Sequence, residues 1–83
     1  MVINIINWNS QSIHQKLVEF FNYVCKYNIS VATISETWLK PSISFKHSNY
    51  ICYRNDRTSA PHGGVAIIVK NDIKHELLPS LHS

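Results

Sequence analysis

The stretch ISVATISETWL, Ile29–Leu39, decides how the rest of this sequence is interpreted. Its first part, Ile29–Ser35, consists of apolar and small residues and is too short for a helix, which predicts a buried strand. Glu36 follows at once, with Trp38 two positions later. In open α/β sheets, ligands bind outside the carboxyl ends of the strands. The stretch therefore predicts a strand and, directly after it, a candidate site.

The residues before this stretch predict a second strand and a helix. Val2–Trp8 (VINIINW) is rich in β-branched residues and is expected to be a strand, mostly buried on both faces. Ser12 stands three residues before Gln15, which fits a capping box at a helix start. Asn28 can adopt the left-handed conformation that ends a helix. Between them, apolar residues recur at helical spacing: Ile13, Leu17, Phe20, Phe21, Val24.

A strand–helix–strand unit of this kind makes its two strands parallel neighbours. The carboxyl ends of parallel strands meet at one edge of the sheet, so Asn9 and Glu36 are expected to lie side by side there. A carboxylate and a carboxamide could hold a hard cation and an anionic oxygen, and glutamate oxygen suits Mg²⁺. The residues alone leave other interpretations open. Glu36 could be an ordinary solvated loop residue or a cap, and Asn9 could be a turn former.

The second half of the chain predicts an antiparallel hairpin. Tyr50–Asp56 (YICYRND) is expected to be a strand, and Gly64–Val69 is expected to pair with it across a loop that contains Pro61. Gly63 and Gly64 are interpreted as the tight start of this strand. Its core, VAIIV, is apolar on both faces. Ile73–Leu78 is expected to begin a fifth strand.

Length and composition limit the size of the domain and the class of protein. The chain has 83 residues, which suits one small domain, and 45% hydrophobic against 16% charged residues excludes a disordered chain. Two cysteines, Cys25 and Cys52, without a CxxC pair are expected to be free thiols of an intracellular protein. No apolar run approaches the roughly 20 residues that span a membrane. The formal charge of +3 permits contact with nucleic acid, although Lys and Arg are scattered.

Four motifs in order carry a family resemblance: WN at 8–9, SETWL at 35–39, YRNDR at 53–57 and GGVAIIVK at 63–70. Together they resemble the endonuclease domain of non-long-terminal-repeat retrotransposons, especially jockey-like elements. That domain is part of the endonuclease/exonuclease/phosphatase superfamily, which includes the apurinic repair endonucleases. The resemblance extends over about residues 2–79.

The resemblance implies a fold, a cofactor and roles for residues. Members of the superfamily are two-sheet α/β sandwiches that hydrolyse phosphate esters with a divalent cation, usually Mg²⁺, with Mn²⁺ possible. Asn9 matches the asparagine that contacts the scissile phosphate, and Glu36 matches the metal-binding glutamate. Arg54 and Arg57 fall in a segment near the DNA face and are expected to bind substrate. Gln11 stands where repair members carry an aspartate.

The resemblance also implies partners. In a full-length element the domain nicks DNA in the nucleus, and the exposed 3′ end primes a reverse transcriptase domain encoded downstream. The later motifs of the family, an Asp/Asn pair and a terminal Asp-His pair, have no counterpart in residues 1–83. The chain is therefore expected to be the N-terminal part of such a domain, inactive by itself. The expected fold is an incomplete α/β sandwich: strand–helix–strand, then an antiparallel hairpin, with one sheet face lacking a cover.

Two alternatives remain. The chain could be part of another superfamily member, such as a repair nuclease or a phosphatase, although SETWL and YRNDR favour the retroelement branch. It could also be a small non-catalytic nucleic-acid-binding module with a ferredoxin-like fold, as in RNA-binding domains. That fold would insert another strand between the first two, so the strand order distinguishes a ferredoxin-like module from an endonuclease-type fragment.

Overall fold

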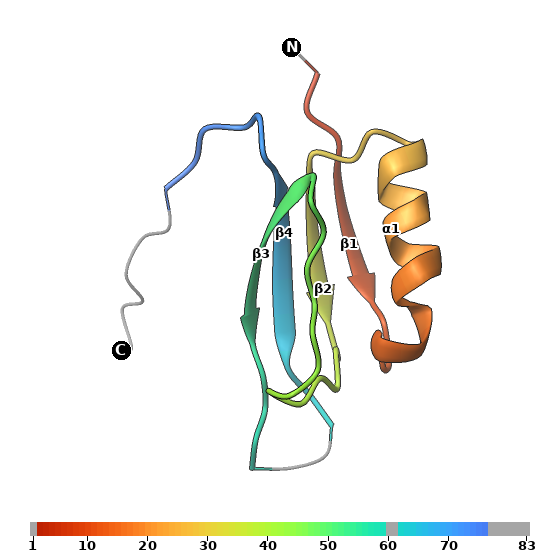
Figure 1. The fold of residues 1–83 in the computed structure, drawn as a ribbon, viewed down its shortest axis with the longest axis vertical. Coiled ribbons are helices and arrows are strands. Elements are labelled where there is room, and N and C mark those ends of the chain that lie inside the picture. The colour runs from red at the N-terminus through yellow and green to blue at the C-terminus, as the bar shows by residue number, and fades with distance from the viewer. Residues whose placement is uncertain (1, 60–61, 77–83) are drawn as a thin grey trace.

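The computed structural model describes residues 2–59 and 62–76. It contains one sheet, one α-helix and a short 3₁₀ turn: β1 (Ile5–Asn9), η1 (His14–Lys16), α1 (Leu17–Lys26), β2 (Val31–Ser35), β3 (Tyr50–Asn55) and β4 (Val65–Lys70). The strand order is β1-β2-β4-β3 (Figure 1). No helix within the described residues has the length and apolar character needed to cross a membrane.

The expected strand–helix–strand unit is confirmed. β1 and β2 pair in parallel, from Ile5 opposite Val31 to Asn9 opposite Ser35, with no strand between them. This order contradicts the ferredoxin-like alternative. Asn28 has a φ of 51° and so takes the expected left-handed conformation after α1.

The capping box predicted at Ser12 is wrong. α1 begins only at Leu17, and neither its start nor that of η1 has a side-chain cap. Ser12 has a φ of 81°, and its backbone N–H donates instead to the carbonyl of Glu36 at 3.0 Å. A tertiary contact therefore replaces the local cap, because this loop packs against the segment that follows β2.

The expected hairpin is also confirmed, since β3 and β4 pair antiparallel. β4 pairs on its other side with β2, also antiparallel, which places the apolar VAIIV run in the interior of the sheet. The fifth strand expected over Ile73–Leu78 does not form in its described part, residues 73–76. Residues 77–78 lie outside the described residues.

The core lies on one face of the sheet. Helix α1 covers this face beside β1 and β2 (Figure 1). There Trp8 stacks on Phe20, with ring centroids 5.5 Å apart. The loop after β2 adds Phe45, whose ring lies 5.6 Å from that of Phe21. The buried hydrophobic residues of this cluster come from α1, β2, β3, β4 and the segments between elements: Ile13, Phe20, Val24, Ile29, Ala32, Ile34, Leu39, Phe45, Tyr50, Ala66, Ile68.

The other face of the sheet is open in the described part of the chain. Ile5 is 66% exposed, Val65 52% and Ile67 39%. The prediction that Val2–Trp8 is a strand buried on both faces is therefore wrong. The strand begins at Ile5, it forms an edge of the sheet, and only one of its faces meets the helix. The expected uncovered face is confirmed over most of its length: Val65 and Ile67 of VAIIV project from it exposed, whereas Val69 at the end of the run is buried.

Tyr50 offers a test of how β3 is joined to the helix end. Its side chain is buried, and its hydroxyl lies 2.8 Å from the carbonyl oxygen of Ile29 and 3.2 Å from that of Val24. We expect Tyr50→Phe to lower the free energy of unfolding by about 1–3 kcal/mol, because buried carbonyls lose their donor. Urea unfolding at neutral pH measures the change, and an unchanged midpoint would contradict it.

The same residue should make stability depend on pH. Burial, followed by the negative charges of Cys25 and Asp72, raises the pKa of Tyr50 above its usual 10.0. The neutral phenol is therefore favoured in the folded state. The stabilisation of the folded state by the neutral Tyr50 phenol is fully present below pH 10.0 and is lost as the pH rises through the raised pKa. Wild-type protein should lose more stability above pH 10.0 than Tyr50→Phe does.

Candidate functional site

The segment of residues 35–38, here called the Glu36 segment, leaves β2 and is held from one side by the loop after β1. Backbone N–H groups of Ser10, Ser12 and Ile13 donate to the carbonyls of its first three residues, at 3.0 Å each. The buried Ser10 hydroxyl adds a bond of 2.9 Å to the carbonyl of Glu36. The Glu36 segment is thus fixed to the end of β1.

The start of β4 holds the Glu36 segment from the other side. The N–H of Thr37 donates to the Gly64 carbonyl at 3.2 Å, and that of Trp38 donates to the Gly63 carbonyl at 2.8 Å. A Cβ atom on Gly64 would lie 2.6 Å from Thr37 Oγ1. The two glycines were expected only to start a strand, and the contact of Gly64 with Thr37 was not predicted. The pair itself was the available signal, because glycine in a strand often marks close approach of another backbone.

Non-glycine residues in the left-handed region gather at this end of the sheet. Glu36 has a φ of 52° and Trp38 of 54°, while Gln11 and Ser12 on the facing loop have 45° and 81°. Such conformations cost of order 1–3 kcal/mol each and persist where the surroundings impose them. Because they cluster at active sites and ligand clamps, they point to this end as a functional one.

The Glu36 carboxylate is half-buried and has one fixed oxygen. Its Oε2 accepts a hydrogen bond of 2.8 Å from the indole Nε1 of Trp38. The Trp38 ring in turn stacks on His62, with centroids 4.0 Å apart and planes 17° apart. No described residue donates a hydrogen bond to Oε1. The arrangement orients the carboxylate and leaves one oxygen for a ligand.

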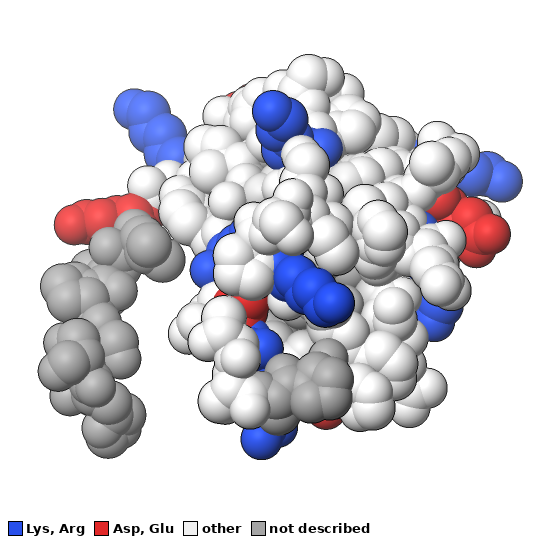
Figure 2. All heavy atoms as spheres, turned by 60° about the horizontal axis from the view of Figure 1, so that its bottom comes forward, with Lys and Arg blue, Asp and Glu red and all other residues white. Residues whose placement is uncertain are grey.

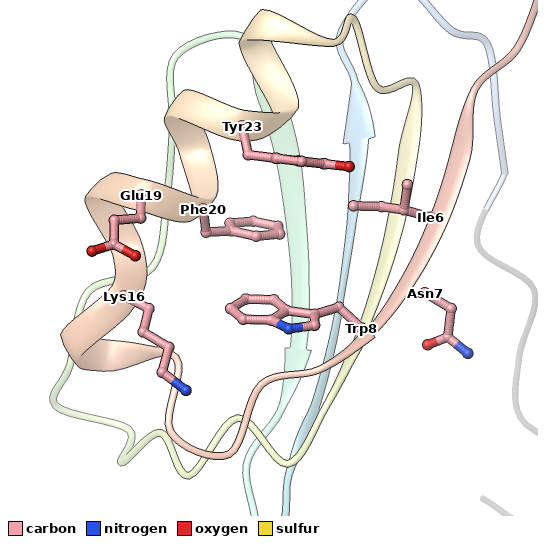
Figure 3. Close-up of a pocket in the computed structure, with 7 residues that line it drawn as sticks. All are labelled: Ile6, Asn7, Trp8, Lys16, Glu19, Phe20 and Tyr23. Atoms are coloured by element: carbon pink, nitrogen blue, oxygen red, sulfur yellow. The ribbon is translucent and has the colours of Figure 1, made fainter.

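Asn9 lies at the same end of the sheet. It is the last residue of β1, pairs with Ser35 and is exposed. Figure 3 shows Trp8 directed toward α1 and Asn7 directed away from it. Side chains alternate along a strand, so Asn9 projects from the same face as Asn7, the open one. The structure therefore brings Asn9 next to the residue that precedes Glu36; the roles of both toward phosphate or metal stay predictions.

The two arginines differ in their surroundings. Arg54 binds both carboxylate oxygens of Asp56, at 3.1 and 2.7 Å, and the carbonyls of Ile43 and Lys40, at 2.5 and 2.8 Å. It therefore holds the loop after β2. Arg57 is exposed, and its aliphatic chain lies beside Gly63. Of the two, only Arg57 is exposed; the substrate-binding role of both stays a prediction.

Basic side chains surround the site. Lys16 donates to the Ser10 carbonyl at 2.6 Å, and Lys40 and Arg57 are exposed in loops at the same end. Figure 2 shows Lys and Arg side chains scattered over this end of the molecule, with acidic side chains exposed at its left and right edges and others partly covered nearer the centre. Asp56 is paired with Arg54, so its charge is compensated within the protein.

A concavity lies between β1 and α1, away from Glu36. It has a volume of about 430 Å³, and three of its seven lining residues are aromatic (Figure 3). Sequence reasoning did not find it, because it arises where an edge strand and a helix leave space between them. Its lining residues are Ile6, Asn7, Trp8, Lys16, Glu19, Phe20 and Tyr23.

The donor set can be tested against a divalent cation. Among the described residues, no three His, Cys, Asp or Glu side chains are close enough to hold a metal ion together. Mg²⁺, however, is usually held by one or two carboxylates together with substrate phosphates and water. Glu36, with one oriented carboxylate oxygen, fits that pattern as a single protein ligand.

The chain was compared with known proteins in sequence and in fold. No family model matches the chain. It is 31% identical over 77 residues to the probable RNA-directed DNA polymerase from transposon X-element of Drosophila melanogaster, a match over 90% of this chain and 8% of that protein.

Two solved structures are similar in fold. One is the 3′ phosphatase NExo from Neisseria bound to a product DNA hairpin, with a TM-score of 0.69 and 19% identity. The other is an AP endonuclease from Archaeoglobus fulgidus, with a TM-score of 0.66 and 18% identity. In each case 82% of this chain covers 27% of the solved chain. The resemblance seen in the sequence is confirmed: the chain is similar to part of a transposon RNA-directed DNA polymerase, and its fold matches part of a 3′ phosphatase and part of an AP endonuclease.

Proposed function

We propose that this chain supplies the metal-binding side of a divalent-cation-dependent DNA endonuclease that nicks target DNA to prime reverse transcription. The carrying observation is the Glu36 segment, which is clamped from both sides, strained, and presents one oriented carboxylate at the end of the sheet where β1 ends with Asn9. A repair nuclease or a phosphatase would use the same two residues. The similarity to a transposon RNA-directed DNA polymerase supports the retroelement reading.

Each residue has a distinct role in this proposal. Glu36 holds the cation through Oε1, and the Asn9 carboxamide donates a hydrogen bond to a phosphate oxygen, stabilising its developing charge. Arg57 and Lys40 attract the DNA backbone. Arg54 acts on substrate only through the loop that it holds. Mg²⁺, or Mn²⁺ in its place, supplies polarisation of the phosphate and neutralisation of charge when bound.

The proposal assigns the remaining chemistry to other parts of a longer protein. In-line hydrolysis also needs an oriented water and a stabilised leaving oxygen. In residues 2–59 and 62–76, His62 stacks on Trp38 beside Glu36, and no three His, Cys, Asp or Glu side chains lie close enough to hold a metal ion together. The partners of the complete protein would be nuclear DNA and a downstream reverse transcriptase domain.

A polypeptide of residues 1–83 is therefore expected to show little or no Mg²⁺-dependent nicking. One carboxylate binds Mg²⁺ weakly, because the ion gives up its water reluctantly. Relaxation of supercoiled plasmid with and without Mg²⁺ measures this. Robust nicking that disappears in Glu36→Ala would show instead that the chain forms a complete site, for example as an oligomer.

Metal binding by Glu36 can be tested separately from cleavage. Paramagnetic Mn²⁺ broadens amide NMR signals near its site even when binding is weak, and a short DNA duplex can supply phosphate. We expect signals of residues 9–12 and 35–38 to broaden first, and Glu36→Gln to abolish this pattern. Asp72→Asn, an exposed carboxylate in the turn after β4, is the matched control. Equal broadening in wild type and Glu36→Gln would refute the proposed function.

A further inference from the structure

We infer that Trp38 is a positioning residue for Glu36: its indole N–H fixes one carboxylate oxygen so that the other is presented to the cation. This inference rests on the proposed function, because it concerns how the metal ligand is oriented. The observations that carry it are the hydrogen bond, the anchoring of the indole ring and the absence of a core role for that ring.

The hydrogen bond determines what Glu36 can do. Trp38 Nε1 lies 2.8 Å from Glu36 Oε2, which is within the range of a charge-assisted bond. An indole donates but carries no charge, so the carboxylate keeps its full negative charge for a cation. A lysine or arginine in the same place would neutralise it. Carboxylate ligands of metals are commonly held by such outer hydrogen bonds.

The indole ring is itself fixed by the connection between β3 and β4. The His62 ring stacks on it at 4.0 Å, and the Trp38 backbone N–H donates to the Gly63 carbonyl at 2.8 Å. His62 therefore covers one face of the indole ring, and the hydrogen bond to Gly63 fixes the backbone of Trp38. Glu36 is oriented through Trp38 by residues more than twenty positions away in the sequence.

Trp38 does not behave as a core residue. It is half-buried and is absent from the hydrophobic core and from the partly buried residues packed against it, whereas Trp8 is among the latter and stacks on Phe20. Its φ of 54° is unfavourable for a bulky side chain. Core packing therefore does not account for a tryptophan here, and the hydrogen bond to Glu36 does.

Trp38→Phe is the informative substitution, because it keeps an aromatic ring for His62 and removes only the donor. We expect the Mn²⁺ concentration for half-maximal broadening of residues 35–38 to rise at least about tenfold. Trp8→Phe keeps the stack on Phe20 and serves as the matched control, with wild-type broadening. Urea unfolding of each variant separates lost positioning from lost folding.

A second readout reports the hydrogen bond directly. The proton NMR signal of the Trp38 indole N–H should move upfield in Glu36→Gln, because the charged acceptor is replaced by a neutral one, while the Trp8 signal stays in place. Trp38→Phe with wild-type Mn²⁺ broadening would overturn the inference while leaving the proposed function intact. Glu36→Gln with wild-type broadening would overturn both.

Discussion

Arg54→Ala is expected to lower the free energy of unfolding by about 3 kcal/mol, because it leaves a buried carboxylate without its partner. The Asp56 side chain is only 8% exposed, and Arg54 contacts both of its oxygens. Two carbonyls of the loop after β2, those of Lys40 and Ile43, also lose their donor. Urea unfolding measures the loss, and NMR signals of residues 40–47 should change because that loop is released.

Two variants make this prediction specific. Arg57→Ala removes an exposed arginine of the same segment and should change stability by no more than about 0.5 kcal/mol. The double variant Arg54→Ala with Asp56→Asn should be more stable than the sum of the single effects by at least about 1 kcal/mol, because no unpaired charge remains. Equal stability of Arg54→Ala and Arg57→Ala would contradict the structural role of Arg54.

This result also bears on substrate binding. The resemblance placed both arginines near the DNA face, but the structure shows that Arg54 is engaged by four contacts within the protein. Weaker DNA binding by Arg54→Ala would therefore reflect release of a loop. Weaker binding by Arg57→Ala at unchanged stability would identify a direct contact, and only Arg57 permits that clean test.

The parts of the fold that local patterns specify could be predicted from the sequence. The apolar runs gave β2 and β4, and the helical spacing from Ile13 to Val24 gave the buried side of α1. A helix between two strands implied their parallel pairing, which in turn placed Asn9 and Glu36 at one end of the sheet. Each step needs only hydrophobic periodicity and connection rules.

The features that depend on distant contacts could not be predicted. Ser12 resembles a helix cap, but its N–H bonds to Glu36, a residue far along the chain. Val2–Trp8 is apolar enough for a buried strand, but its exposure depends on which elements cover it. The role of Trp38 depends on His62 and Gly63, and no local pattern reveals that these residues meet it.

The second large effect is expected at Gly64. Gly64→Ala should lower the free energy of unfolding by about 3 kcal/mol. About 1–2 kcal/mol reflects the φ of +87°, which L-residues disfavour. The remainder reflects overlap of the new Cβ with Thr37 Oγ1, which would lie at 2.6 Å from it. Relief of this overlap would shift the Glu36 segment, so Mn²⁺ broadening of residues 35–38 should weaken as well.

Gly63→Ala is the matched control for this prediction. Its φ of +99° is equally unfavourable, but its Cβ would meet Arg57 Cδ at 2.6 Å, which rotates aside, and Arg57 Cβ at 3.3 Å, which needs only a small shift. It should therefore cost only the conformational part, about 1–2 kcal/mol. Adding Thr37→Ala to Gly64→Ala removes the hydroxyl and should restore part of the loss, whereas adding it to Gly63→Ala should not. Equal losses at the two glycines would show that the backbone conformation alone requires glycine, and that Gly64 does not fix the position of Glu36 through Thr37.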